Sequence, residues 1–262
     1  MSYVVRHAGF GRPDLRLAAR SLRFGVRVHL GSFMAIGNYR LDQWFIGVMA
    51  GSAELGRYSV AVAWAEVLFY IPGVLVLVQR PDLVRASGEQ AARLASQMFR
   101  FALLVAGLVS AALILLAPVL CAWVFGEQFT GSVNDLRLLA LAGSGIVALE
   151  VLGNALTSQR RPMLTTSAIC VAFTATLVLD LLLIPRFGGA GAAAATAIAW
   201  TLGGITAIGI FRRVFHEESN TLLPSGRDIA TIRKTVQGQL ERLSAGRHAV
   251  RTAHDESHEP AG

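Results

Sequence analysis

A long apolar stretch from Leu22 to Gly51 that carries charged residues inside it constrains this chain more than any other feature. The stretch exceeds the roughly 20 apolar residues that cross a bilayer as a helix. Asn38, Arg40 and Asp42 fall at about membrane depth in such a helix. Charged side chains at that depth usually face a protein interior or a wet cavity, and they often mark a transport path. The first hypothesis is therefore a transporter.

The overall composition points to an integral membrane protein. Of 262 residues, 53% are hydrophobic and only 16% are charged, and the mean hydropathy is +0.52. A soluble domain of this size does not carry so much apolar surface. The net charge of +7 comes from arginines between apolar runs, not from one basic stripe interleaved with aromatics. We interpret these arginines as topology signals, and we do not expect nucleic acid as a partner.

Six apolar runs are long enough to be membrane spans. They cover residues 22–51, 55–79, 98–125, 133–159, 162–184 and 191–215. Basic residues gather before the first run and after the second, fourth and sixth runs, whereas the other connections hold few. The positive-inside rule then places both termini in the cytoplasm, which agrees with an even number of spans. The sequence therefore predicts an all-α membrane protein with one bundle of six transmembrane helices.

The predicted organisation has three parts. Residues 1–21 form a basic cytoplasmic segment, residues 22–215 form the bundle, and residues 216–262 form a polar cytoplasmic tail. Within the tail, apolar residues recur at spacings of three and four, which predicts an amphipathic helix over about 227–244. These residues are Ile229, Ile232, Val236, Leu240 and Leu243.

Arg40 and Asp42 are the first candidate functional pair. Two residues apart on a helix, they do not face one another, so each needs its own partner. Arg40 lies one turn from Trp44, which permits a cation–π contact, while Asp42 would point toward another helix. The alternative is a structural ion pair with a neighbouring span.

Other acidic residues lie inside the apolar runs. Glu66 precedes Pro72, a residue that can kink the helix and open a small cavity. Glu150 lies near the predicted cytoplasmic third of its span, where we expect a structural role.

Asp180 and Thr176 lie one turn apart on one helical face. A hydroxyl and a carboxylate so placed can supply oxygen ligands to a small cation, and Thr196 on the sixth span can add another. The alternative is that Asp180 is hydrated near the outer interface.

The sixth span carries small residues at strict intervals of four. These residues are Gly191, Ala195, Ala199, Gly203 and Ala207. Such a stripe lets another helix approach closely, so we expect packing here. No set of nucleophile, base and orienting group stands out, and no metal site is expected, so the sequence does not predict an enzyme.

Several segments together resemble a known family. They are NYRLDQWFIGVMAGSAELGRYSVAVAWAEVLFYIPGVLVLVQRPDL, FTGSVNDLRLLALAG, LTSQRRPML and LDLLLIPRFGGAGAAAATAIAW. This set resembles the polysaccharide flippases of the multidrug/oligosaccharidyl-lipid/polysaccharide exporter superfamily. The resemblance covers residues 22 to about 215 and corresponds to the C-terminal six-helix bundle of a family that has two. Residues 1–21 look like the linker that joins the two halves.

The resemblance implies a flippase in the inner (plasma) membrane that moves polyprenyl-diphosphate-linked oligosaccharide by alternating access. It also implies substrate contacts at Arg40, with Trp44 and Glu66 beside it, because an arginine binds phosphate bidentately. In the lipid II branch of the superfamily a sodium site occupies similar places, here Asp42, Thr176, Asp180 and Thr196. The expected coupling ion is Na⁺ or H⁺, and no other cofactor is expected.

The resemblance further implies membrane lipids and a second six-helix bundle as partners, either a separate N-terminal half or another copy of the chain. Two rival functions stay open at this point. One is a non-transporting membrane scaffold of a polysaccharide assembly complex that acts through the tail after His216. The other is a drug or cation antiporter of the same superfamily.

Overall fold

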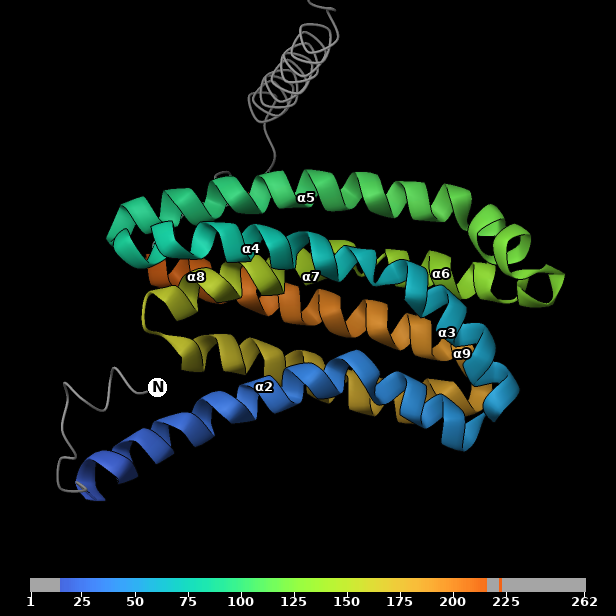
Figure 1. The fold of residues 1–262 in the computed structure, drawn as a ribbon, viewed down its shortest axis with the longest axis horizontal. Helices are drawn as coiled ribbons and strands as arrows, with labels where there is room; N and C mark the ends of the chain where they lie inside the picture. Colours follow the sequence, from blue (N-terminus) through green and yellow to red (C-terminus); the bar gives the residue numbers. More distant parts are fainter. Residues whose placement is uncertain (1–14, 216–221, 223–262) are drawn as a thin grey trace, which may run out of the picture.

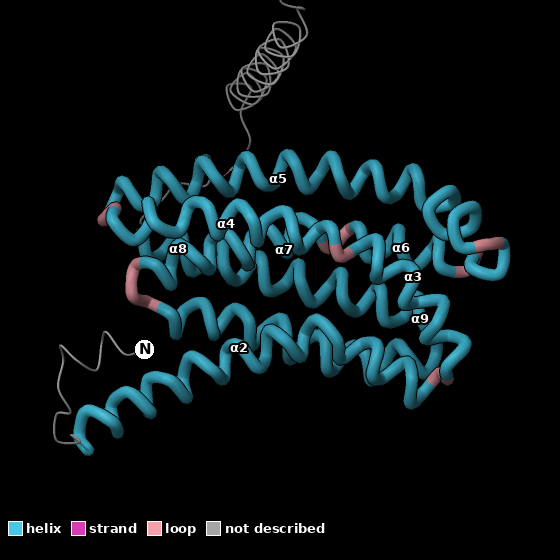
Figure 2. The backbone as a smooth tube through the Cα atoms, in the orientation of Figure 1, coloured by secondary structure: helices cyan, strands magenta, loops and turns pink. Residues whose placement is uncertain are grey.

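The computed structural model describes residues 15–215 and Leu222, and the described part is a bundle of helices without strands (Figures 1 and 2). In chain order the elements are α2 (Leu15–Met49), α3 (Ser52–Ala65), α4 (Val67–Arg85), α5 (Gly88–Pro118), η1 (Val119–Trp123), η2 (Glu127–Phe129), α6 (Ser132–Ala140), α7 (Gly143–Val147), η3 (Ala148–Leu152), α8 (Gly153–Ser158) and α9 (Pro162–Phe215). The all-helical prediction is confirmed for this part. The predicted tail helix over 227–244 lies outside the described residues.

Helix α2 begins at Leu15, ahead of the predicted start of the first span. No proline interrupts the sequence between Leu15 and Met49, so the basic segment and the apolar segment continue as one helix. The helix ends before Gly51, whose φ of 87° only a glycine adopts readily. Figure 1 shows α2 along one edge of the bundle and α5 along the other.

Helices α3 and α4 together form one apolar segment, Ser52–Arg85. Their helical hydrogen bonding changes at Glu66, whose carbonyl accepts from the Phe69 N–H at 3.0 Å in a tighter turn. Pro72 lies inside α4. It has no N–H, and its ring crowds the carbonyl of the preceding turn. The irregularity therefore places the Glu66 side chain at a local break in the helix.

Helix α9 folds back on itself at Gly188. The backbone there has φ 56° and ψ −131°, outside the helical region, and helical geometry resumes on either side. The two arms pack against each other so closely that a Cβ at Gly203 would lie 2.8 Å from the Ala172 Cβ. All five residues of the predicted small-residue stripe are buried, which confirms their packing role.

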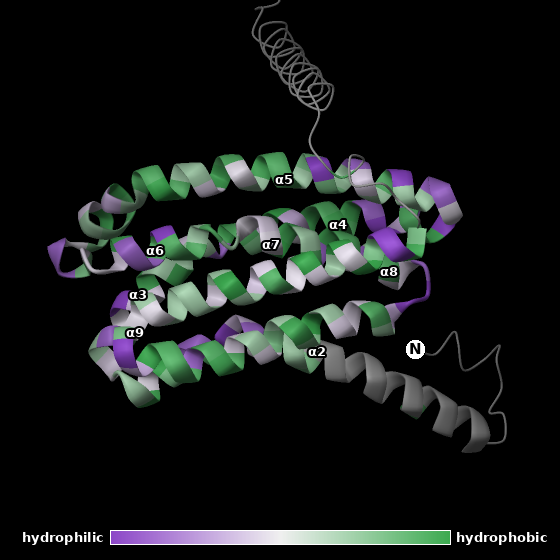
Figure 3. Cartoon of the chain, turned by 180° about the vertical axis from the view of Figure 1, so that it is seen from behind, coloured by the Kyte–Doolittle hydropathy of each residue, from purple (hydrophilic) through white to green (hydrophobic). Residues whose placement is uncertain are grey.

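Three described helices are long and apolar enough to cross a membrane, or four if the bent pair α6 and α7–α8 counts as one span. Helix α2 is not among them, because polar and charged residues lower its hydropathy. Helix α9 enters that count once, although its chain turns back at Gly188. Six spans and the side of the termini therefore stay predictions. Figure 3 shows hydrophobic residues along the helices and hydrophilic ones gathered toward several connections.

Candidate functional site

A cavity of about 290 Å³ opens between α2, α3–α4 and the second arm of α9. Its polar lining comes from Asn38, Arg40, Asp42, Glu66 and Thr196. The cavity forms where α2 carries its charges and where the helix breaks at Glu66. Four of the residues predicted as substrate or cation contacts therefore lie around one space.

Arg40 faces this cavity and pairs with Glu66. The Arg40 Nη2 lies 3.0 Å from the Glu66 Oε1, and the two side chains are 56% and 31% exposed. An ion pair that is this open to its surroundings contributes little to stability, and either group can exchange it for a ligand. Trp44, the third predicted substrate contact, is 74% exposed and does not line the cavity.

Asp42 is buried and takes its hydrogen bonds from groups other than Arg40. The Tyr58 hydroxyl donates to the Asp42 Oδ2 at 2.5 Å, and the Gln43 N–H donates to Oδ1 at 2.7 Å. Thr196 lies within hydrogen-bonding reach of both Asp42 and Tyr58. The predicted separation of Arg40 and Asp42 onto different partners is confirmed.

Asp180 lies close enough to Asp42 for the two carboxylates to repel each other. It is fully buried, and neither carboxylate oxygen has a hydrogen-bond partner among the described residues. An isolated ionised carboxylate in such a place costs several kcal/mol. The alternative of a hydrated Asp180 is wrong, because none of its surface is exposed. Two ionised carboxylates at this place are therefore unfavourable.

Thr176 and Asn38 complete this interior cluster. The Thr176 hydroxyl donates to the Asn38 Oδ1 at 2.5 Å, and both side chains are buried. Four predicted cation-site residues thus come from three helical segments to one place: α2, the first arm of α9 and the second arm of α9. We call Asn38, Asp42, Tyr58, Thr176, Asp180 and Thr196 the interior cluster.

The chemistry of the interior cluster is that of an all-oxygen site. No group of three or more His, Cys, Asp or Glu side chains suited to a metal ion occurs in the part of the chain that the structure describes. Two carboxylates with hydroxyl and amide oxygens match a hard cation of low charge. Sequence reasoning missed Tyr58 and Asn38 as members. Asn38 lies one turn before Asp42, which was the available signal.

A second cavity, of about 380 Å³, lies farther along the bundle toward α8. Arg80, Glu150, Asn154, Thr157 and Thr165 provide most of its polar lining, and it shares Asn38 and Trp200 with the first cavity. Tyr39, Phe69 and Trp200 lie at the junction, with ring centroids 4.7 to 5.4 Å apart. The Tyr39 hydroxyl donates to the Glu150 Oε1 at 3.1 Å.

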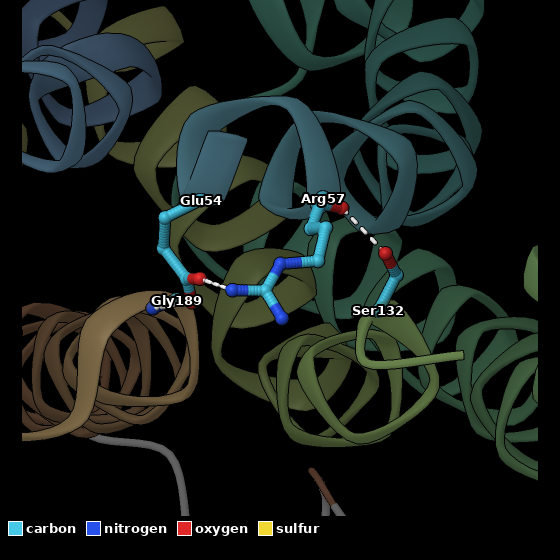
Figure 4. Close-up of polar contacts among 4 residues, drawn as sticks. All are labelled: Glu54, Arg57, Ser132 and Gly189. Carbon is cyan, nitrogen blue, oxygen red and sulfur yellow. Dashed lines mark hydrogen bonds and ion pairs between the residues drawn. The ribbon is translucent and has the colours of Figure 1, made fainter. Parts of the chain in front are cut away.

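A separate polar cluster joins three helices at the end of the bundle near Gly188 (Figure 4). The Glu54 Oε1 accepts from the Gly189 N–H at 2.9 Å, which caps the second arm of α9. Glu54 also pairs with Arg57, whose main-chain carbonyl accepts from the Ser132 hydroxyl at 2.7 Å. Asp135 lies beside this group and is buried. Sequence reasoning assigned no role to these residues.

Comparison with known proteins shows that part of the chain is similar to polysaccharide export proteins. A family model described as "Polysaccharide biosynthesis protein" matches residues 5–134. An EPS I polysaccharide export inner membrane protein, EpsE, of Ralstonia nicotianae is 34% identical over 139 residues, which are 51% of this chain and 31% of that protein. The EpsE protein of Ralstonia solanacearum is 30% identical over the same shares.

Two solved transporters share the fold. A MATE protein in a bent conformation matches with a TM-score of 0.54 and 18% identity. A MOP superfamily transporter from Pyrococcus furiosus matches with a TM-score of 0.57 and 19% identity. Each match covers 79% of this chain and 47% of the other chain. The chain therefore spans less than half the length of the proteins that it matches.

These matches confirm the family resemblance that the sequence predicts. They also agree with a multi-pass membrane protein, because EpsE is an inner membrane protein and the described residues include several long apolar helices. The matched shares do not test whether the chain corresponds to the C-terminal half, which stays a prediction.

Proposed function

We propose that this chain, a partial relative of the polysaccharide flippases, is one bundle of an inner-membrane transporter that flips polyprenyl-diphosphate-linked oligosaccharide for polysaccharide biosynthesis. The observation that carries the proposal is the buried pair Asp42 and Asp180 beside the cavity lined by Arg40. A transporter driven by an ion needs a substrate-facing group and an ion-binding group whose states are linked. Arg40 and Asp42 both lie on α2, and Asp180 lies close to Asp42.

In the proposed mechanism Arg40 receives the diphosphate. Its guanidinium can leave Glu66 and bind phosphate oxygens through two parallel N–H donors. The carboxylate of Glu66 then becomes free for a sugar hydroxyl or for solvent. The exposed, exchangeable character of the Arg40–Glu66 pair supports this role.

A Na⁺ or a proton binds in the interior cluster. Its positive charge relieves the repulsion between Asp42 and Asp180, with oxygen atoms of Thr176 and Thr196 as further ligands for Na⁺. Because these residues belong to α2 and to both arms of α9, ion binding draws α2 toward α9. A shift of α2 against α9 would move Arg40, which lies on α2, and so couple ion and substrate.

The chain works with a second bundle, in a separate chain or in another copy of itself. Alternating access requires two bundles that rock against each other around a central site. The chain covers 47% of each matched transporter structure, which supports one bundle of two.

The test is a flipping assay in proteoliposomes that contain the full chain, alone and with the six-span product of a neighbouring reading frame. We expect flipping only from the pair or from a dimer. Arg40→Ala should abolish flipping, and Arg40→Lys should retain part of it. Arg93→Ala, which removes an exposed arginine of a surface pair, is the matched control.

Robust flipping by a monomer would contradict the two-bundle proposal. Unchanged flipping in Arg40→Ala would remove Arg40 from the substrate path. If both Arg40→Ala and Asp42→Asn leave polysaccharide assembly intact while deletion after His216 abolishes it, the scaffold function replaces the transport function. Cation-dependent drug flux without any dependence on a sugar lipid would identify the antiporter instead.

A further inference from the structure

The second cavity holds a carboxylate that the proposed transport cycle does not use. Glu150 lines this cavity together with Arg80 of α4 and Asn154 of α8. The side chain that acts on the Glu150 carboxylate is Tyr39, whose hydroxyl donates to it at 3.1 Å. Among the described residues, the Tyr39 hydroxyl is thus the donor to this carboxylate, which also faces a polar cavity.

The backbone around Glu150 is also unusual. Glu150 lies in η3, a π-helical turn between α7 and α8. Such turns are rare, and they occur often at functional sites because one extra residue per turn redirects a side chain. In this chain the π turn coincides with the residue that faces the cavity. The structural role that the sequence predicts for Glu150 does not explain why a carboxylate is needed there.

The groups around Glu150 favour a proton over a metal cation. On α2 the facing group is Tyr39, and on α4 it is Arg80; α9 contributes Thr165, Ile169 and Trp200, which carry no charge. Helix α5 packs near η3 through alanines such as Ala102 and Ala106. Glu150 is the one carboxylate of the described residues that lines this cavity, so a metal cation would find a single negative charge beside neutral oxygens, whereas a proton needs only one acceptor oxygen.

The other wall of the junction is fixed. Trp200 is 2% exposed, and its backbone packs directly on Gly145. One turn later, a Cβ at Gly204 would lie 2.8 Å from the Gly145 Cα. The second arm of α9 therefore cannot shift locally without separating two backbones. Of the three rings at the junction, Tyr39 is the one held by a polar bond to a titratable group.

We propose that Glu150 is a proton-binding site that takes its proton from the second cavity and controls the Tyr39 ring between the two cavities. When Glu150 is ionised, its Oε1 accepts the Tyr39 hydrogen bond and holds the ring against Phe69 and Trp200. When a proton from cavity water binds the carboxylate, Tyr39 loses an anionic acceptor, and its hydrogen bond weakens. The ring is then free to leave the junction, which opens the second cavity toward the first cavity, where Asp42 and Thr196 of the interior cluster lie.

This inference rests on the proposed transport function for its purpose, whereas proton binding at Glu150 can be measured without transport. The experiment records pH-difference infrared spectra of the full chain in lipid nanodiscs. We expect a protonated-carboxyl band in the wild type that is lost in Glu150→Gln. In Tyr39→Phe, which keeps the carboxylate, the same band should shift in frequency and in its pH midpoint because the phenolic donor is gone.

Glu89→Gln is the matched control, since Glu89 is a surface carboxylate with 87% of its side chain exposed. It should leave the Glu150 band in place. A band that persists unchanged in Glu150→Gln would overturn proton binding at this site. If Glu150→Gln does not fold, Tyr39→Phe decides, and an unshifted band there would overturn the link to Tyr39. Absence of flipping with these bands present would refute the transport function alone.

Discussion

Two pairs of carboxylates in this molecule have opposite surroundings. At the end of the bundle, Glu54 beside Asp135 accepts a backbone N–H and pairs with Arg57. In the interior, Asp180 beside Asp42 is fully buried and its oxygens have no donor among the described residues. In the first pair, Glu54 is satisfied by the fold and helps to hold it together. In the second pair, Asp180 is a cost to the fold, and the proposed ion site rests on this cost.

Replacement of Asp180 should weaken ion binding more than any other change, whereas it should leave the stability of the chain unchanged or raise it. Asp180→Asn removes a buried charge without breaking a hydrogen bond of the described residues, so the melting temperature in the absence of ligand should stay or rise. Added Na⁺ or protons should stabilise the wild type, and the variant should bind them with an apparent affinity at least about tenfold lower, a difference of about 1.4 kcal/mol. Thermal unfolding of the purified chain against ion concentration measures both. A lower melting temperature with full ion dependence would make Asp180 a structural residue.

Loss of the Tyr58 hydroxyl should come next. Tyr58→Phe removes the hydroxyl that donates to Asp42 at 2.5 Å, and a hydrogen bond to a charged group is worth about 1.5 to 3 kcal/mol. We therefore expect a lower melting temperature together with an altered ion dependence, because Asp42 both accepts this hydrogen bond and is a proposed ion ligand. Tyr70→Phe, at a tyrosine that is 66% exposed, is the control and should change neither. Equal behaviour of the two variants would remove Tyr58 from the site.

The pair at the end of the bundle should behave as structure only. Glu54→Ala uncovers the Gly189 N–H and breaks the pair with Arg57, and loss of such a cap costs about 1 to 2 kcal/mol. Glu54→Gln keeps an oxygen acceptor for Gly189 and should lose less. Chemical or thermal unfolding of both variants measures which of them loses more stability. Any loss of ion dependence in Glu54→Ala would show that the two carboxylate pairs are coupled, against the comparison above.

The interior pair was within reach of sequence reasoning, whereas the end pair was not. Helix geometry alone separates Arg40 from Asp42 and places Thr176 beneath Asp180, because these relations are local. The small-residue stripe of α9 follows from its four-residue spacing in the same way. Which helix each group meets depends on packing between segments that lie far apart in sequence.

The contacts of Glu54 and Glu150 that sequence reasoning missed join segments that lie far apart in sequence. The bond from Gly189 to Glu54 spans 135 residues, and the bond from Tyr39 to Glu150 spans 111. No residue pattern near Glu54 predicts that its carboxylate caps a helix so far away in sequence. Glu150 carries an additional difficulty, since its π turn is a backbone feature that hydropathy and spacing do not register.

The smallest effect should come from a surface carboxylate, Glu89, which pairs with Arg93 on α5. The Arg93 Nη2 lies 3.3 Å from the Glu89 Oε2, but the Arg93 side chain is 75% exposed and the Glu89 side chain 87%, so solvent screens the pair. Glu89→Ala should change the free energy of unfolding by no more than about 0.5 kcal/mol, and it should leave the ion dependence untouched. A larger loss, measured beside Glu54→Ala under the same conditions, would mean that exposure in the isolated chain does not describe the surroundings of α5. That face would then be covered in the assembled transporter, and the contrast between satisfied and unsatisfied carboxylates would need the second bundle to be complete.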